Sequence, residues 1–382
     1  MIKKVIFAVI IVCLFTNAVP SSAVVFRTSD MAGDWYVYSI EVNINLPAVY
    51  WLRGFMKVDE MGNITEGTYY APDNTMVTIS SGQFGLNAQG IISGNFTAEG
   101  NLATAVNGKL DQSKTIGTAV LAGTDNTLDF VNFFKGGGTF GTNDLEGTWY
   151  GYQTLIDAST GAVFWVYGTY TVDASGNVSG SYAGPDGSIL TIDSGKLSVD
   201  SEGIITGNLS LSNGQTTTIV HGKLDQSKTM AVGVSVEPGG VMGIAYQVKA
   251  GGTFKQSDAA GNWYVYSLNI DPTIPAVYWA YGKAGIDALG NITGSYNAPT
   301  GQSVKLTSTF QMNNEGLSTG TFNFDTGDSG ILPSIKLDQG KTSMVGVTII
   351  TSGSSVGTMS ILQFIKDSNI AMPWTPLLLI DE

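Results

Sequence analysis

Three tryptophans, each preceded by another aromatic residue, are the best candidates for binding chemistry in this chain. Two residues after them stand Arg53, Tyr167 and Tyr281. Paired rings on an outer strand face can stack on a sugar ring or on another flat ligand. The predicted ligand-binding residues are therefore Trp51, Trp165, Tyr167, Trp279 and Tyr281. The alternative is that these rings pack one unit against another, because large apolar patches usually mark an interface.

The sequence contains no comparable residue pattern that indicates catalysis or metal binding. His221 is the only histidine, and a lone histidine between a strand and a turn is expected at the surface. No Cys, His and carboxylate cluster has the spacing of a zinc or iron site. The turns that begin at Asp59, Asp173 and Asp287 lack the alternating oxygen ligands and closing Glu of a calcium loop. We therefore expect a non-enzymatic protein with no metal site and no cofactor.

The candidate tryptophans lie in a tandem repeat. The segment Asp144–Tyr152, which reads DLEGTWYGY, recurs with few changes at Asp30–Tyr38 and at Asp258–Tyr266. A fixed period of this length indicates consecutive copies of one domain. The predicted units are residues 30–142, 143–256 and 257–366. The joins between them are only a few residues long, so the units should sit close together.

Turn motifs divide each unit into short strands. An Asp or Asn caps each turn and a Gly supplies the positive φ that ends it. In the first unit the predicted strands are 35–42, 48–58, 64–70, 76–84, 91–96, 103–110, 115–122 and 129–134. Eight strands joined by hairpins leave two exposed edges unless the sheet closes. The predicted fold is all-β, with three tandem antiparallel eight-stranded up-and-down β-barrel repeats of about 113 residues.

The second strand of the first unit shows the alternation expected for a barrel wall. One face of this strand carries Tyr50, Leu52, Gly54, Met56 and Val58, which we assign to the lumen. The other face, with Trp51 and Phe55, is assigned to the exterior and is unusually apolar for such a position. The candidate tryptophans should therefore lie outside the barrels.

Short motifs resemble the avidin-type barrels and, more loosely, the calycin group that includes the lipocalins. They are Gly147–Tyr150 on a first strand and Ser179–Tyr182 after a hairpin. Those folds pair a first-strand Trp with a basic residue on the last strand, and the last strands here end in Lys135, Lys249 and Lys366. The resemblance implies that Lys249 meets Trp149, and that each barrel could carry a small apolar ligand. Biotin binding is not implied, because Trp within the units occurs only in the first two strands.

The N-terminal segment is typical of an export signal. Residues 1–23 combine two early lysines, a short apolar run and small residues at the end, which indicates a cleaved signal peptide. A lipid anchor at Cys13 is disfavoured, because the residues before it are not small. Cys13 is the only cysteine, so the units must fold without disulfides. The net charge of −13 argues against nucleic acid as a partner.

These observations predict an exported bacterial repeat protein that is extracellular, on the cell surface or periplasmic. We expect it to act as a multivalent binding or scaffold module, since three similar faces can multiply a weak contact. The expected partner is a carbohydrate or an envelope component. The alternative is a carrier of a small apolar ligand inside calycin-like barrels. The apolar C-terminal tail, 367–382, is too short to span a bilayer, so no transmembrane segment is expected in the mature chain.

Overall fold

The computed structural model describes residues 24–45, 48–271 and 276–368. The predicted signal peptide, 1–23, and residues 369–382 of the tail lie outside this part of the chain. Within the described residues, no helix has the length and apolar character needed to cross a membrane.

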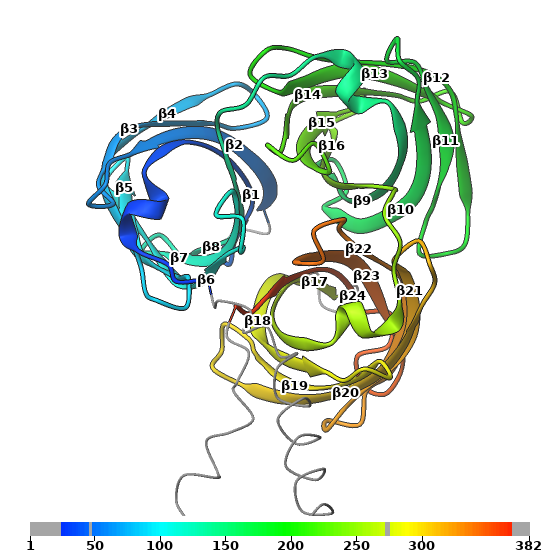
Figure 1. Cartoon of the computed structure of the whole chain (residues 1–382). Coiled ribbons are helices and arrows are strands. Elements are labelled where there is room, and N and C mark those ends of the chain that lie inside the picture. The colour runs from blue at the N-terminus through cyan, green and yellow to red at the C-terminus, as the bar shows by residue number, and fades with distance from the viewer. Residues whose placement is uncertain (1–23, 46–47, 272–275, 369–382) are drawn as a thin grey trace, which may run out of the picture.

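The chain forms three closed barrels, each of eight antiparallel strands in sequence order (Figure 1). The first consists of β1 Gly33–Asn43, β2 Ala48–Val58, β3 Ile64–Tyr70, β4 Met76–Leu86, β5 Ile91–Ala98, β6 Asn101–Leu110, β7 Ile116–Gly123 and β8 Thr127–Lys135. The second consists of β9 Gly147–Asp157, β10 Ala162–Val172, β11 Val178–Ala183, β12 Ile189–Val199, β13 Ile204–Leu211, β14 Thr216–Leu224, β15 Met230–Val236 and β16 Val241–Lys249. The third consists of β17 Gly261–Asp271, β18 Ala276–Ile286, β19 Asn291–Asn297, β20 Ser303–Met312, β21 Leu317–Phe324, β22 Ser329–Leu337, β23 Ser343–Ser352 and β24 Met359–Lys366. The predicted fold class is confirmed.

Each barrel closes by pairing its first strand with its last, and a short 3₁₀ helix precedes each first strand. These helices are η1 Thr28–Met31, η2 Thr142–Leu145 and η3 Gln256–Ala259. The predicted inside–outside alternation of β2 is correct, because Tyr50, Leu52 and Met56 line the lumen of the first barrel. Gly54 lies on the same face and must be Gly, since a Cβ there would lie 2.7 Å from the Thr68 carbonyl oxygen.

One end of every barrel is closed by a tryptophan and a lysine. The indole nitrogen of Trp149 donates a hydrogen bond of 2.7 Å to the Leu145 carbonyl oxygen of η2. The Lys249 ammonium lies 5.3 Å from the centre of the Trp149 ring and donates to the Asp144 carbonyl oxygen. The same contacts recur at Trp35 with Lys135 and at Trp263 with Lys366. The contact that the calycin resemblance implied is therefore present in all three barrels.

We expect Lys249→Ala and Trp149→Ala to destabilise the second barrel unequally. Loss of the cation over the indole should lower the free energy of unfolding by about 0.5–2 kcal/mol. Loss of the buried indole should lower it by about 3–5 kcal/mol, because it also leaves a cavity. Urea unfolding of the two variants measures both values. Equal losses would show that the lysine does more than cover the ring.

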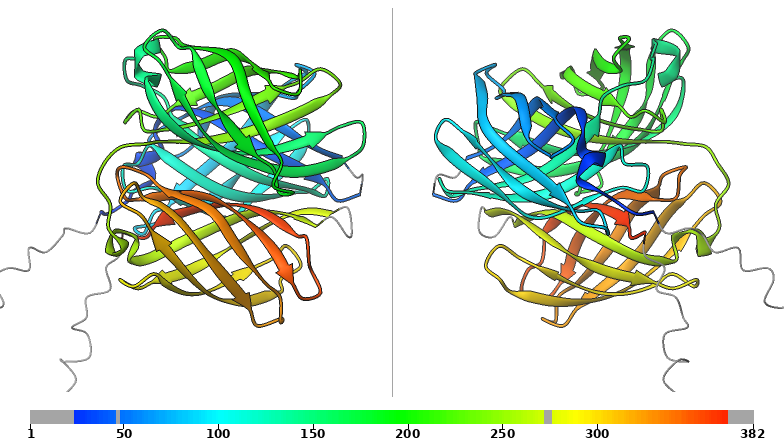
Figure 2. Two further views of the ribbon diagram at one scale, coloured as in Figure 1. Left: turned by 90° about the vertical axis from the view of Figure 1, so that its right-hand side faces the viewer. Right: turned by 60° about the vertical axis from the view of Figure 1, so that its left-hand side comes forward.

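The three barrels lie side by side around a common centre (Figures 1 and 2). Each has an apolar core of its own, and a fourth apolar cluster is built from the outer faces of all three. We call this arrangement the three-barrel ring. Near its centre, Asn132 of β8 donates a 3.0 Å hydrogen bond to the Tyr246 hydroxyl of β16, and Thr118 of β7 lies 2.6 Å from the side-chain oxygen of Gln363 of β24.

Candidate functional site

The three candidate tryptophans lie on the barrel exteriors, where they fill the contacts between barrels. Trp51 of β2 donates a 3.1 Å hydrogen bond to the Ser235 carbonyl oxygen of β15, in the second barrel. Trp165 of β10 does the same to Thr348 of the third barrel, at 3.0 Å. Trp279 of β18 closes the cycle with a 3.0 Å bond to Leu121 of the first barrel. The second strand of each barrel is thus fastened to the seventh strand of the next.

These positions are not the free exterior faces that the predicted ligand-binding role requires. Trp51 is 0% exposed, and Trp165 and Trp279 are also buried. Tyr167 and Tyr281 are half-buried and lie against Trp165 and Trp279, with ring centres 5.7 and 5.9 Å apart. A ring that is covered by the next barrel has no free face on which a sugar could stack. The alternative, that the rings pack unit against unit, describes their positions.

A tyrosine on the first strand of each barrel strengthens the same contacts. The hydroxyl groups of Tyr38, Tyr152 and Tyr266 hydrogen-bond to residues on the sixth strand of the next barrel, which are His221, Ser334 and Asn107. His221 is consequently half-buried between two barrels and 2.7 Å from the Tyr38 hydroxyl, so the expectation of a surface histidine was wrong. Burial and the nearby Arg53 charge lower the pKa of His221 to about 4, so the ring is neutral at physiological pH.

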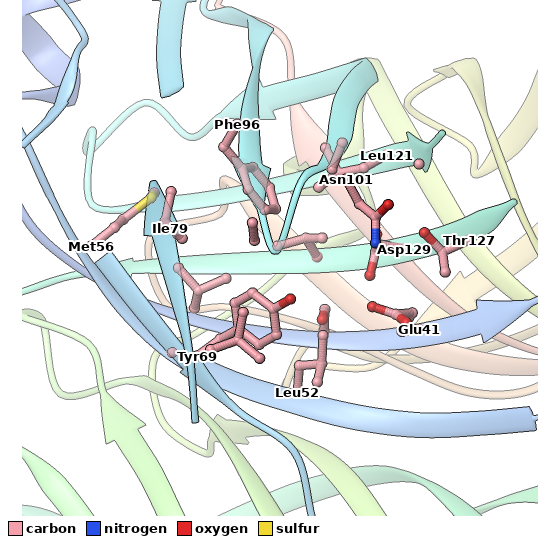
Figure 3. A pocket seen from close by; sticks show the side chains of 18 of the residues that line it. Glu41, Leu52, Met56, Tyr69, Ile79, Phe96, Asn101, Leu121, Thr127 and Asp129 are labelled. Carbon is pink, nitrogen blue, oxygen red and sulfur yellow. The ribbon is translucent and has the colours of Figure 1, made fainter. Parts of the chain in front are cut away.

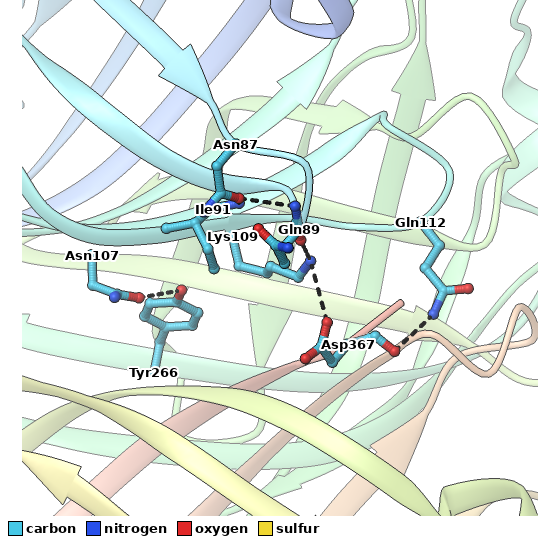
Figure 4. A network of polar contacts seen from close by, with 8 residues as sticks. All are labelled: Asn87, Gln89, Ile91, Asn107, Lys109, Gln112, Tyr266 and Asp367. Atoms are coloured by element: carbon cyan, nitrogen blue, oxygen red, sulfur yellow. Dashed lines mark hydrogen bonds and ion pairs between the residues drawn. The ribbon is translucent and has the colours of Figure 1, made fainter. Parts of the chain in front are cut away.

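A fully buried lysine lies in each contact between barrels. Lys109 of β6 donates to the Gln89 carbonyl oxygen and lies 4.0 Å from a carboxylate oxygen of Asp367, which follows the third barrel (Figure 4). Its ammonium is 4.7 Å from the Phe26 ring centre and 5.3 Å from that of Tyr264. Lys223 and Lys336 occupy the same position in the other two contacts. Each ammonium therefore lies between an aromatic ring of its own barrel and one of the preceding barrel.

These lysines should make the stability of the three-barrel ring depend on pH. Burial lowers the pKa of Lys109, Lys223 and Lys336 to about 8, whereas an unfolded lysine titrates near 10.4. Between these values each of these lysines binds more protons in the unfolded chain than in the folded chain, so its contribution to the free energy of unfolding rises with pH. We expect a rise of about 2 kcal/mol per lysine between pH 8 and pH 10. Lys223→Met should flatten this rise in thermal melts, and the exposed Lys305→Met should not.

The lumen of the first barrel contains a larger cavity than the lumens of the other two barrels. Its volume is about 240 Å³, against about 70 Å³ in the second barrel and about 100 Å³ in the third. Apolar side chains such as Met56, Ile79 and Phe96 form one part of the wall, and Glu41, Thr127 and Asp129 form another (Figure 3). For comparison, an apolar cavity of about 150 Å³ in a protein core is large enough to bind benzene.

Differences in side-chain size at equivalent positions explain why the cavity is larger in the first barrel than in the other two. Ala98 of β5 pairs with Ile79, and the residues in the same register of the other barrels are Leu211 and Phe324. Replacing a methyl group with a phenyl ring fills much of the space that Ala98 leaves open. The second barrel also has Tyr170 in the register position of Met56. The cavity is thus a property of the first copy of the repeat.

Two acidic side chains distinguish the first lumen further. Glu41 of β1 and Asp129 of β8 are direct cross-strand partners, and both line the cavity. The corresponding pairs are Leu155 with Gly243 in the second barrel and Asn269 with Ser360 in the third. We call Glu41 and Asp129 the acidic pair. It lies toward the barrel end opposite the Trp35–Lys135 contact.

Burial disfavours the ionised form of both carboxyl groups in the acidic pair. It raises the pKa of the Asp129 carboxyl well above its usual range, and the charges of Glu41 and Asp125 raise it further. Burial also raises the pKa of Glu41, although the Tyr50 hydroxyl donates a hydrogen bond to that carboxylate. Like charges placed directly opposite on neighbouring strands repel each other. A cation placed between the two carboxyl groups would relieve both effects.

A metal ion fits this site poorly. In the part of the chain that the structure describes, no three Cys, His, Asp or Glu side chains gather closely enough to hold one. The acidic pair was not predicted, because its members lie far apart in the chain. Comparing inward positions across the three repeats would have revealed it, since only the first unit has acids there.

Comparisons with known proteins show only distant likeness. No protein-family model and no curated protein matches the sequence. Among solved structures, transferrin binding protein B from Neisseria meningitidis matches with 11% identity and a TM-score of 0.29, over 88% of this chain and 77% of that one. A protein with unknown function from Nostoc punctiforme matches with 11% identity and a TM-score of 0.23, over 59% of this chain and 99% of that one. Scores this low do not support an argument about function.

Proposed function

We propose that this protein is an exported, non-enzymatic carrier that binds a small ligand in the lumen of its first barrel. The observation that supports this proposal best is the cavity of about 240 Å³, because the cavities of the second and third barrels are less than half as large although the fold is the same. Closely packed protein interiors contain few voids larger than a water molecule. A cavity of this size costs stability, so its presence in one copy favours a use for it.

The carrier function fits the structure better than multivalent binding through aromatic faces. That hypothesis needed three exposed tryptophans, and all three are buried between barrels. The lumen also suits a ligand in its chemistry, since small-molecule sites combine apolar walls with a few placed polar groups. The calycin resemblance supports the same proposal. In this account the second and third barrels hold the first one in the three-barrel ring.

Filling the lumen tests the proposal. Purified protein should bind a ring-sized apolar probe such as propylbenzene, with one site detected by calorimetry. Ala98→Phe introduces the residue that the third barrel has in this register and should weaken binding at least about tenfold, because the probe and the phenyl group compete for one space. Undiminished binding by the Ala98→Phe variant would place the site outside the first lumen and contradict the proposal.

A further inference from the structure

We propose that the ligand of the first barrel is a small apolar molecule with a positively charged amine, and that the acidic pair binds this amine. This inference rests on the proposed function and specifies the chemical class of its ligand. The structural basis is a buried carboxylate that faces the cavity without a hydrogen-bond partner in the described chain, in a lumen that also has an apolar part.

The Asp129 carboxylate faces the lumen and has no hydrogen-bond donor among the described residues. The Asp129 side chain is only 5% exposed. Buried polar groups in folded proteins are almost always paired, so an unpaired one calls for an explanation. The nearby Asp125 shows the contrast, because its carboxylate accepts a 2.7 Å hydrogen bond from the Thr127 hydroxyl. Asp129 is therefore the group in this lumen with unused acceptor capacity.

The carboxyl groups around Asp129 have no basic partner. Glu41 lies directly across from it on β1, and Asp125 lies in the turn that leads into β8. No salt bridge between described residues involves any of these three carboxyl groups. Arg53 also lines the cavity but forms no salt bridge with a described carboxylate; its guanidinium lies 4.6 Å from the ring centre of Tyr70. A cation from outside the chain would supply the missing charge.

The shape of the cavity favours an organic cation over a bare ion. The acidic pair lies in one part of the wall, and Met56, Ile79 and Phe96 lie in another (Figure 3). An ammonium group could donate hydrogen bonds to Asp129 and Glu41 while an attached ring or short chain occupies the apolar part. Charge-assisted hydrogen bonds of this kind are among the strongest that a site can offer. A primary amine with a body slightly larger than benzene matches both the volume and the polarity of the lumen.

The test compares amines with neutral molecules of the same shape. The intact mature protein is titrated calorimetrically with 2-phenylethylamine and hexylamine, and with 2-phenylethanol and 1-hexanol. We expect each amine to bind at least about tenfold more tightly than its alcohol. Asp129→Ser introduces the residue of the third barrel and should remove this preference by weakening amine binding alone. Glu41→Asn, drawn from the third barrel in the same way, should reduce the preference less, because Glu41 already has the Tyr50 hydroxyl as a partner.

The outcomes separate this inference from the proposed function. If the alcohols bind as tightly as the amines and Ala98→Phe abolishes both, the lumen binds ligands but the amine inference is wrong. If neither class binds, both proposals fall. An amine preference that persists in Asp129→Ser and in Glu41→Asn would also overturn the inference, since the charge would then be recognised elsewhere. Circular dichroism of each variant verifies that the barrels remain folded.

Discussion

A variant that carries Trp51→Ala, Trp165→Ala and Trp279→Ala is expected to lose the three-barrel ring while its barrels remain folded. Each indole is buried in a contact between barrels and hydrogen-bonded across it. Truncating a buried Trp to Ala costs about 3–5 kcal/mol, because both packing and a filled volume are lost. The barrel lumens have separate cores that do not include these tryptophans. The contacts between barrels should therefore fail first.

Small-angle scattering and far-ultraviolet circular dichroism measure the two parts of this expectation. The triple variant should have a larger radius of gyration than wild type and retain its β-type spectrum. A matched control replaces one exposed apolar residue in each barrel, with Met76→Ala, Ile189→Ala and Ile331→Ala. The control should stay compact. Wild-type dimensions and an unchanged melting temperature in the tryptophan variant would show that the contacts do not depend on these rings.

Ala98→Phe is expected to abolish ligand binding without unfolding the protein. The third barrel already contains a phenylalanine, Phe324, in the same register, so the barrel geometry accepts this side chain. Adding volume to a full core costs about 1–3 kcal/mol, but here the ring enters an existing cavity. Stability should therefore change little, while the space for a ligand is lost.

The reciprocal change provides the control for Ala98→Phe. Phe324→Ala should enlarge the lumen of the third barrel and lower the free energy of unfolding by about 3–5 kcal/mol. It should leave the affinity of the first barrel unchanged, because Phe324 lines a different lumen. Calorimetric titration of both variants with propylbenzene distinguishes the two sites. Equal loss of binding in both would indicate a general effect on folding.

The strands and their faces could be predicted because the information is local. Capped turns such as the one at Asp173 fix the hairpins, and alternation along 48–58 assigns Trp51 to the exterior. Barrel closure followed from the need to remove sheet edges. Packing of unit against unit was among the expectations for the tryptophans, but the partners in the ring were not predicted, since the contacts join residues such as Trp279 and Leu121 that are distant in sequence. Alternation along a strand assigns a Trp to the outer face, but it does not show whether water or another barrel covers that face.

The acidic pair was not predicted either, because its two residues are also distant in sequence. Glu41 and Asp129 become neighbours only when β1 closes on β8, and each alone looks like an ordinary strand or turn residue. The cavity depends on Ala98, whose small size matters only beside Leu211 and Phe324 in the same register. Register is a property of paired strands. Once a tandem repeat and its strands are known, comparison of inward positions between copies is the sequence signal that points to such a site.

Native mass spectrometry of the mature protein, purified without added ligand, tests the central claim most directly. If the first lumen carries a ligand, the wild-type protein should show a small additional mass that dissociates under collision. The same adduct should be absent from Ala98→Phe and present in Phe324→Ala. An adduct that persists in Ala98→Phe, or wild-type protein that carries no adduct and acquires none when incubated with extracts of its own cells, would contradict the account.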